Sequence, residues 1–366
     1  MSSPQVPSAP EGEIRTSSPA SSSEPDGAED PRRKAARLRR RRRLLAWGGV
    51  PAVVVTVVSV WMGFVFLMTL AANRAAIAGD YPTAVSRYEK VAKVNPWLDK
   101  WRVHYNLGTA RLLNNDVDGS ITELEEALEQ RYGLAECVVV DAGQEEAEIE
   151  VALASASATY LETTLTGGDI IGLSSWSATW LAAMQQLPSF RTPVAHKVIQ
   201  LFGGVGNPRV QVKATRLIDL LARATGAEAI FFPSPAVLGS VAAAEQLADD
   251  ASVRRVLDLL PTVTMSLMGI GSLEPSALLR ESGNMTTEAD AAELSEAGAV
   301  GDVCLRFFNA EGRPVASGYD ARLVGASAGQ LRVIPRRVAA AGGDRKHAAI
   351  RGALLGQWVN VLITDV

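Results

Sequence analysis

From about Tyr132 to the C-terminus, short apolar runs alternate with Ala-rich stretches that carry helical spacing. Such alternation predicts an α/β fold, in which helices cover both faces of a parallel sheet. The expected strands are 136–140, 169–173, 197–201, 229–232, 262–268, 303–308, 333–339 and 358–363. The expected helices include 146–161, 211–225 and 344–355. In open sheets of this kind, ligands bind beyond the carboxyl ends of the strands.

Small and hydroxylated residues follow several of the expected strands. The segment Ser174–Thr179 comes directly after one strand, and its hydroxyls and amides at the start of a helix suit an anion such as phosphate. Glycine pairs follow two further strands, at Gly203 and Gly204 and at Gly269 and Gly271. Glycine turns of this kind are also common as packing features, and hydroxyls there can simply cap a helix.

The stretch from Gly298 to Gly312 places Asp302 just after a glycine turn and before an apolar run. Glycine lacks a Cβ, so the backbone can approach a ligand closely at such a turn. The Asp302 carboxylate is then a natural acceptor for hydroxyl groups. The competing interpretation is a structural turn whose aspartate caps a helix.

Lys346 lies at the start of the helix that precedes the last expected strand, after the glycines of Ala340–Asp344. A lysine there can neutralise a phosphate or meet a sugar carbonyl, although a solvated surface charge is the simpler interpretation. Neither glycine pair extends to a Gly-x-Gly-x-x-Gly fingerprint, and the sequence has no Walker loop. We therefore expect no nucleotide cofactor.

The cysteines and histidines exclude some other chemistries. Cys137 and Cys304 lie far apart in apolar runs, which favours buried small hydrophobes over a disulfide or a metal site. His104, His196 and His347 are scattered along the chain. The sequence therefore predicts no metal site and no Ser-His-Asp triad.

Several of these segments together resemble one known family. Residues 132–366 resemble the effector-binding domain of the SorC (DeoR-like) sugar-binding transcriptional regulators. The resemblance is carried by Gly168–Thr179, Gln200–Gly204, Pro233–Ala236, Gly269–Gly271, Gly298–Asp302 and Ala341–Lys346. It implies a Rossmann-like, doubly wound sheet related to sugar-phosphate isomerases. It also implies a phosphorylated sugar as effector, which controls oligomerisation on DNA.

The resemblance also implies a ligand site. Ser175, Ser177 and Thr179 would contact the phosphate, Asp302 the sugar hydroxyls, and Lys346 the phosphate or a carbonyl. Arg306 and Asn309 would be neighbours of the site. The backbone at the site would be formed by Gly203, Gly204, Gly269 and Gly271.

Three departures from the family pattern affect these expectations. Ser177 stands where the family usually has glycine, which predicts a narrower phosphate loop. The chain ends at Val366, where the family continues into a helix, so part of one sheet face is expected to be uncovered. Family regulators read DNA through an N-terminal helix-turn-helix. We find no such unit here and do not expect direct DNA contact.

The N-terminal segments have a different character. Residues 1–31 are rich in Ser, Pro and acidic residues, a composition typical of a disordered tail. The basic run 32–43 then borders the uncharged apolar stretch 44–72, which predicts one transmembrane helix. A signal peptide would begin earlier and be shorter. The arginines could suggest DNA binding, but beside a span they predict a cytoplasmic N-terminus, with residues after 72 outside.

Residues 73–130 have helical spacing and resemble about one and a half tetratricopeptide repeats. The matching positions are Gly79, Tyr81, Ala84, Tyr88, Asn95, Pro96, Tyr105, Asn106, Leu107, Gly108, Ala110, Ile121, Leu124 and Ala127. Asn95–Pro96 would end one helix. The segment is expected to be either a protein-docking module or a helical spacer.

Three functions fit these observations. The first is a membrane-tethered module that binds a phosphorylated sugar and can self-associate. The second is an isomerase-like enzyme that uses Asp302 and Lys346, and it is disfavoured because no second well-placed acid or base accompanies them. The third is a tetratricopeptide scaffold. Because phosphosugars are cytoplasmic and the predicted topology places the domain outside, a fusion of two proteins near Arg131–Tyr132 is a further hypothesis.

Overall fold

The computed structural model describes residues 31–95, 99–274, 280–281 and 287–366. They divide into two units, one that ends at Phe64 and one that runs from Val65 to Val366. The strands are β1 (Glu136–Val140), β2 (Asp169–Leu173), β3 (Ala195–Gln200), β4 (Glu228–Ile230), β5 (Met265–Ser272), β6 (Ala299–Val303), β7 (Arg306–Asn309), β8 (Arg336–Ala340) and β9 (Val361–Asp365).

Helices alternate with these strands, as the sequence predicts. They are α1 (Pro31–Ile77), α2 (Tyr81–Val94), α3 (Lys100–Leu113), α4 (Val117–Tyr132), α5 (Glu146–Thr164), α6 (Ala178–Gln186), α7 (Pro208–Thr225), α8 (Val241–Asp249), α9 (Ala251–Leu257), α11 (Glu288–Glu296), α12 (Ala328–Val333) and α13 (His347–Leu355). Three short 3₁₀ turns are η1 (Leu260–Thr262), η2 (Asp320–Arg322) and η3 (Asp344–Lys346).

The main sheet has the strand order β1-β9-β8-β5-β2-β3-β4, and every pair along this path is parallel. The predicted parallel α/β sheet is therefore confirmed. The structure adds one feature that the prediction lacked. β5 continues beyond the parallel region and pairs with β6 in antiparallel fashion, and β6 pairs with β7 in the same way. This extension lies at the carboxyl end of β5.

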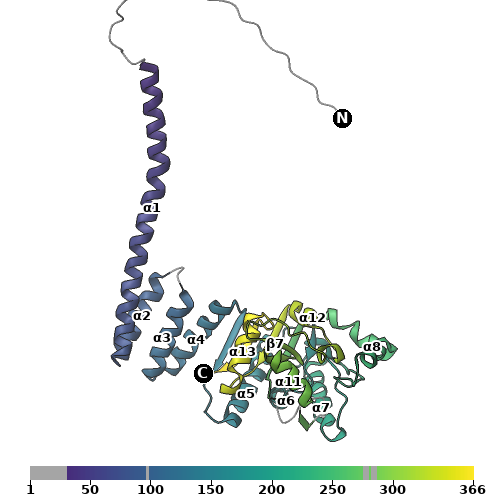
Figure 1. Ribbon diagram of the computed structural model, residues 1–366. Helices are drawn as coiled ribbons and strands as arrows, with labels where there is room; N and C mark the ends of the chain where they lie inside the picture. Colours follow the sequence, from purple (N-terminus) through teal and green to yellow (C-terminus); the bar gives the residue numbers. More distant parts are fainter. Residues whose placement is uncertain (1–30, 96–98, 275–279, 282–286) are drawn as a thin grey trace, which may run out of the picture. The chain divides into compact units, whose positions relative to one another are not determined.

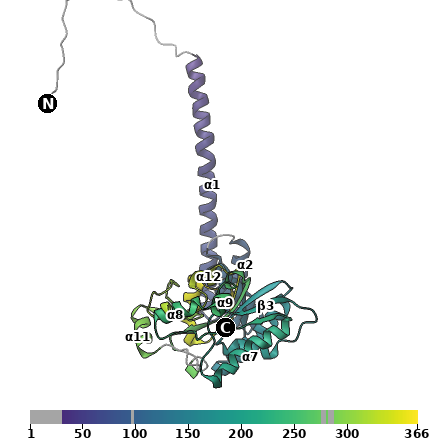
Figure 2. The same cartoon turned by 90° about the vertical axis from the view of Figure 1, so that its right-hand side faces the viewer.

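Alternating side chains divide the core between the two faces of the sheet. In β9, Val361 and Ile363 belong to one buried cluster, whereas Leu362 belongs to the other. Helices α5, α6 and α7 cover the first face, and Figure 1 shows them along the lower side of the strands. In the turned view of Figure 2, α7 again lies below β3, whereas α12 lies above it.

Helix α4 closes one edge of this sheet. β1 is an edge strand, and the Glu129 and Glu125 side chains of α4 accept hydrogen bonds from the backbone N–H groups of Cys137 and Val139, both at 2.9 Å. The two glutamates are one helical turn apart and the two amides are two residues apart on the strand, so both pairs meet at once. α4 thereby satisfies backbone donors that an edge strand otherwise leaves to water.

The helices before the sheet pack closely against one another. Gly108 of α3 lies against α4, where a Cβ would lie 3.0 Å from Leu124 Cγ, so close packing at this glycine agrees with the sequence prediction. α2 ends at Val94, and Asn95 follows in an extended conformation. Pro96, the other half of the predicted stop, lies outside the described residues. Tetratricopeptide identity itself stays a prediction.

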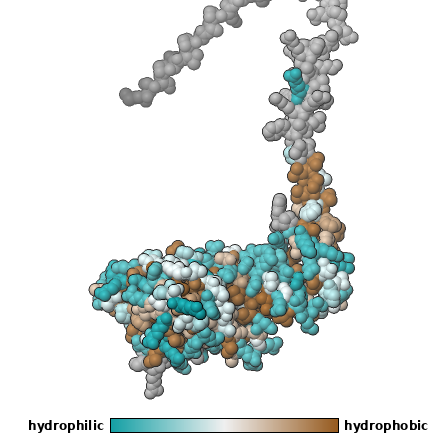
Figure 3. All heavy atoms as spheres, turned by 180° about the vertical axis from the view of Figure 1, so that it is seen from behind, coloured by the Kyte–Doolittle hydropathy of each residue, from teal (hydrophilic) through white to brown (hydrophobic). Residues whose placement is uncertain are grey.

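α1 contains one stretch that is long and apolar enough to cross a membrane. It runs from Pro51 to Ile77, whereas the sequence predicted 44–72. Most of its large apolar side chains are exposed, for example Val53 at 63% and Phe66 at 67%. Figure 3 shows this apolar surface in brown on the helix. The predicted disordered tail lies almost entirely outside the described residues.

Several predicted boundaries were wrong. The strand predicted at 333–339 begins only at Arg336, because Ser327 caps a short helix that occupies residues up to Val333. The strand predicted at 262–268 begins at Met265 and continues to Ser272. Gly269 and Gly271 therefore lie within a strand and do not form a turn after it.

Candidate functional site

A pocket of about 170 Å³ opens at the carboxyl ends of the central strands. Its walls come from the start of α6, the end of β5, the β6–β7 turn, η3 and the first turns of α5. Most of the predicted site residues line it, namely Ser177, Thr179, Gly269, Gly271, Asp302 and Lys346. The expectation that ligand-type residues meet at this edge of the sheet therefore agrees with the structure.

The start of α6 forms one wall of the pocket. Ser177 is the N-cap of this helix, and its Oγ accepts a hydrogen bond from the Trp180 N–H at 3.3 Å. The Trp180 indole N–H donates to the carbonyl of Met268 at 2.7 Å, which fixes α6 against β5 beside Gly269. A helix N-terminus combines free N–H groups with a positive dipole end, so this wall suits an anion.

Asp302 of β6 lines the pocket and is paired with Gly271 of the neighbouring strand β5. A Cβ on residue 271 would come within 2.1 Å of Asp302 Oδ1, so only glycine leaves room for this carboxylate. Burial raises the pKa of Asp302 to about 6, although the Leu305 N–H and the charge of Lys346 act in the opposite direction. Asp302 is therefore a desolvated hydrogen-bonding group.

The turn after Asp302 corrects one prediction. Residues 303–308 were expected to form one strand, but Cys304 and Leu305 have φ angles of 53° and 61° and join β6 to β7 as a tight hairpin. Asp302 Oδ2 accepts from the Leu305 N–H at 2.8 Å. The Oδ2 atom of Asp302 therefore has a structural role in a turn, as the competing interpretation expected, but it does not cap a helix. The other oxygen lies beside Gly271.

Lys346 lines the pocket from the N-terminus of α13. Its side chain is half-buried, and burial together with the neighbouring Arg345 lowers its pKa. The charges of Asp302, Glu146 and Glu150 act in the opposite direction. Within the part of the chain that the structure describes, no carboxylate forms an ion pair with Lys346. Its ammonium group is therefore available to an anionic ligand.

Some pocket residues were not predicted. Trp176 is 7% exposed and lines the pocket, and its indole nitrogen has no hydrogen-bond partner among the described residues. Buried donors are rarely left unpaired, so this one is a candidate ligand contact. Glu150 and Cys304 also line the pocket. Trp176 lies within the predicted Ser174–Thr179 segment, where only the hydroxyl and amide groups were predicted to bind a ligand.

Three predicted site residues do not line the pocket. Ser175 is buried and its hydroxyl donates to the carbonyl of Phe202 at 3.4 Å. Gly203 lies against the backbone of residue 235, where a Cβ would meet the Pro235 carbonyl at 2.1 Å. Gly204 lies against the Gln200 side chain. The family resemblance implied ligand contacts for these positions, but in the structure they serve internal packing and hydrogen bonding.

Arg306 and Asn309 are also structural. Arg306 is 6% exposed and donates to the Ala326 carbonyl at 2.9 Å and to the Asp320 carboxylate at 2.8 Å. The Asn309 side chain accepts from the backbone of Arg313 at 2.9 Å. Neither residue lines the pocket.

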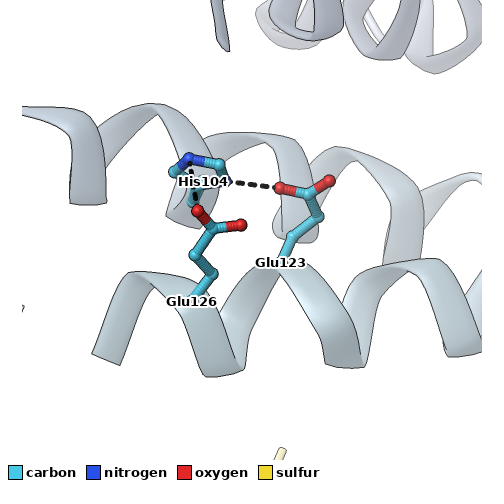
Figure 4. A group of neighbouring side chains, drawn as sticks. All are labelled: His104, Glu123 and Glu126. Atoms are coloured by element: carbon cyan, nitrogen blue, oxygen red, sulfur yellow. Dashed lines mark hydrogen bonds and ion pairs between the residues drawn. The ribbon is translucent and has the colours of Figure 1, made fainter. Parts of the chain in front are cut away.

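A second group of ionisable residues lies between α3 and α4 (Figure 4). His104 Nδ1 is 2.7 Å from Glu123, and its Nε2 is 3.5 Å from Glu126. Their ligand-type atoms lie within 4.8 Å of one another, so the prediction of scattered histidines missed this cluster, whose members come from two helices. Because each ring nitrogen faces a different carboxylate, the arrangement favours an interhelical bridge over a metal chelate.

A family model, individual relatives and solved structures all match about two thirds of the chain. The Sugar-bind family, described as a sugar-binding domain, matches residues 119–366. The match begins within α4. The fusion junction hypothesised near Arg131–Tyr132 therefore lies inside the matched region. Cys137 and Cys304 also lie inside the matched region, and both are buried free cysteines, as the sequence predicts.

Individual relatives are regulators. A deoxyribonucleoside regulator of Bacillus subtilis (strain 168) is 33% identical over 242 residues, covering 65% of this chain and 75% of that protein. The erythritol catabolism regulatory protein EryD of Brucella abortus (strain 2308) is 30% identical over 255 residues, covering 68% and 79%. A solved sugar-binding domain of the transcriptional regulator DeoR from Pseudomonas syringae pv. tomato is 38% identical, with a TM-score of 0.53, covering 67% and 94%.

Proposed function

The chain belongs to the family of sugar-binding domains found in DeoR/SorC-type transcriptional regulators, and we propose that its pocket binds a phosphorylated sugar as an effector. The names of its relatives concern a deoxyribonucleoside and erythritol, which suggests a small polyhydroxylated ligand. Because these relatives are regulators, we propose a sensor and not an enzyme.

The observation that carries this proposal is the pairing of two chemistries in one pocket. The N-terminus of α6, with Ser177 and Thr179, and the Lys346 ammonium suit a phosphate group. The buried Asp302 carboxylate suits sugar hydroxyls, and the Trp176 indole N–H can donate to a ligand oxygen. A phosphosugar presents both kinds of group.

Calorimetric titration of the full-length chain in detergent tests the proposal. The ligands are ribose 5-phosphate, glucose 6-phosphate and fructose 6-phosphate, each beside its free sugar. We expect one phosphosugar to bind, its free sugar to bind at least tenfold more weakly, and Lys346→Ala to weaken binding about tenfold. Lys213→Ala, on exposed α7 surface outside the pocket, is the control. Lack of binding to every ligand by a folded sample would reject the proposal.

We also propose that the apolar stretch of α1 anchors the chain in a membrane, with the basic run 32–43 on the cytoplasmic side. This orientation would place the pocket outside the cytoplasm, away from cytoplasmic phosphosugars. Labelling with a membrane-impermeant maleimide decides the side. The native cysteines are buried, so an Asp141→Cys variant reports on the domain and a Ser3→Cys variant on the N-terminus.

The segment 73–130 is proposed to be a helical spacer that can also dock a protein. Its α4 belongs to the sugar-binding match, so any docking surface would lie on α2 and α3. Self-association of the sugar-binding domain is a further proposal that rests on the family alone.

A further inference from the structure

Three charged residues form a cluster at the rim of the pocket, which we call the rim cluster. Arg345 of η3 donates from Nη2 to Glu146 Oε1 in the first turn of α5. Its Nη1 lies 3.7 Å from Glu274 Oε2, just after β5. All three residues line the pocket. One guanidinium therefore connects three separate walls across the rim.

These ion pairs are exposed, because the side chains of Arg345, Glu146 and Glu274 are 47%, 76% and 66% accessible. Exposed pairs contribute little to stability, so they are easily exchanged for a better partner. A phosphate group is such a partner, since it carries more charge than a carboxylate and can accept two parallel hydrogen bonds from a guanidinium. Neutral sugars offer no comparable exchange.

Resting on the proposed phosphosugar function, we propose that the rim cluster is the selectivity element of the pocket. In the structure, Glu146 and Glu274 hold Arg345. A sugar phosphate displaces both carboxylates and takes the guanidinium as a second cation beside Lys346. Ligands with a weaker anionic group, or none, leave the carboxylates in place and meet their negative charge at the rim.

The exchange makes a prediction that distinguishes it from a merely structural ion pair. Removing Arg345 takes a cation from the ligand, whereas removing Glu146 or Glu274 releases that cation to the ligand. The two sides of one ion pair should therefore affect affinity in opposite directions. A pair that only stabilises the fold would give the same direction from either side.

The test uses the full-length chain, titrated with the three phosphosugars above and with inorganic phosphate. We expect Arg345→Gln to weaken phosphosugar binding about tenfold, and Glu146→Gln or Glu274→Gln to strengthen it about two- to fivefold. Glu148→Gln, on an exposed α5 position outside the pocket, should change nothing and controls for net charge. In the Arg345→Gln background, Glu146→Gln should no longer strengthen binding.

The outcomes are distinct. Variants that act in the same direction, or a gain from Glu146→Gln that persists without Arg345, would overturn the rim cluster inference and leave the phosphosugar function standing. If inorganic phosphate shows the same variant pattern as the sugar phosphates, the exchange is supported for phosphate itself. Absence of binding by the unmodified chain would reject both proposals together.

Discussion

The pocket and the contacts among α2, α3 and α4 both contain buried or half-buried ionisable groups, but these groups are paired differently. Between these helices, His104 contacts Glu123 and Glu126, while Arg111 contacts Glu89 of α2 and Asp116 at 2.9 and 3.1 Å. In the pocket, Asp302 and Lys346 influence each other, yet they form no ion pair with each other in the described chain. For groups that are withdrawn from solvent, direct pairing is typical of structural charge, and the lack of an ion-pair partner is typical of a ligand site.

The largest expected effect is the pH dependence that Asp302 gives to the unfolding free energy. Its pKa in the folded protein is raised to about 6, so protonation favours the fold. This stabilisation is complete below about pH 4 and is lost as the pH rises through 6. Relative to Asp302→Asn, the unmodified chain should lose about 3 kcal/mol of unfolding free energy between pH 4 and 7.

Thermal unfolding of both proteins over this pH range measures the difference. Parallel stability curves would show that Asp302 is not desolvated in the folded state. The Asn side chain keeps an oxygen that can accept from Leu305, so the turn should survive the substitution.

Substitutions at two glycines of β5 should show whether the position of Asp302 governs ligand affinity. Gly271→Ala should push the Asp302 carboxylate out of place and weaken phosphosugar binding about thirtyfold, roughly 2 kcal/mol. Gly269→Ala is the matched control, because its Cβ would lie at an ordinary 3.6 Å from Ser177 Oγ. We expect less than threefold weakening from it in the same titration. Equal effects from both would mean that the position of Asp302 does not govern affinity.

The interface should show the reverse behaviour. His104→Ala leaves Glu123 without its 2.7 Å partner and should lower the unfolding free energy by about 1.5 kcal/mol. Phosphosugar affinity should stay within twofold, because the cluster lies outside the pocket. A large loss of affinity with unchanged stability would break the distinction between the two regions.

The smallest expected effect concerns the edge of the sheet. Glu129→Ala removes the acceptor of the Cys137 N–H and should cost about 1 kcal/mol of unfolding free energy. Glu129→Gln keeps an acceptor oxygen and should retain most of the stability. Comparable losses from both substitutions would assign the effect to charge and not to the hydrogen bond.

Much of the fold could be predicted from the sequence, because strands buried on both faces are short apolar runs bounded by polar residues. β1 and β2 were predicted with their observed bounds. The β6–β7 hairpin was missed because Cys304 and Leu305 form its turn with positive φ, where glycine or asparagine is the usual signal.

The candidate site was predicted in part for similar reasons. Asp302 and Lys346 follow glycines near strand ends, and the structure places both in the pocket. Gly203 stands in the same sequence context, but it lies against residues 234–235. Sequence position gives the edge of the sheet where a residue lies, whereas the direction of its side chain depends on which distant segment packs against it.

The contact between α4 and β1 has a consequence for how this domain can be combined with others. An open edge strand invites strand addition by another chain and hence aggregation. Glu125 and Glu129 occupy the donors that such a chain would need. A protein that exchanges its N-terminal module can therefore do so safely only ahead of Asp116, the N-cap of α4. Helix α4 must therefore remain part of any chain that contains this sheet, because it covers the edge strand β1.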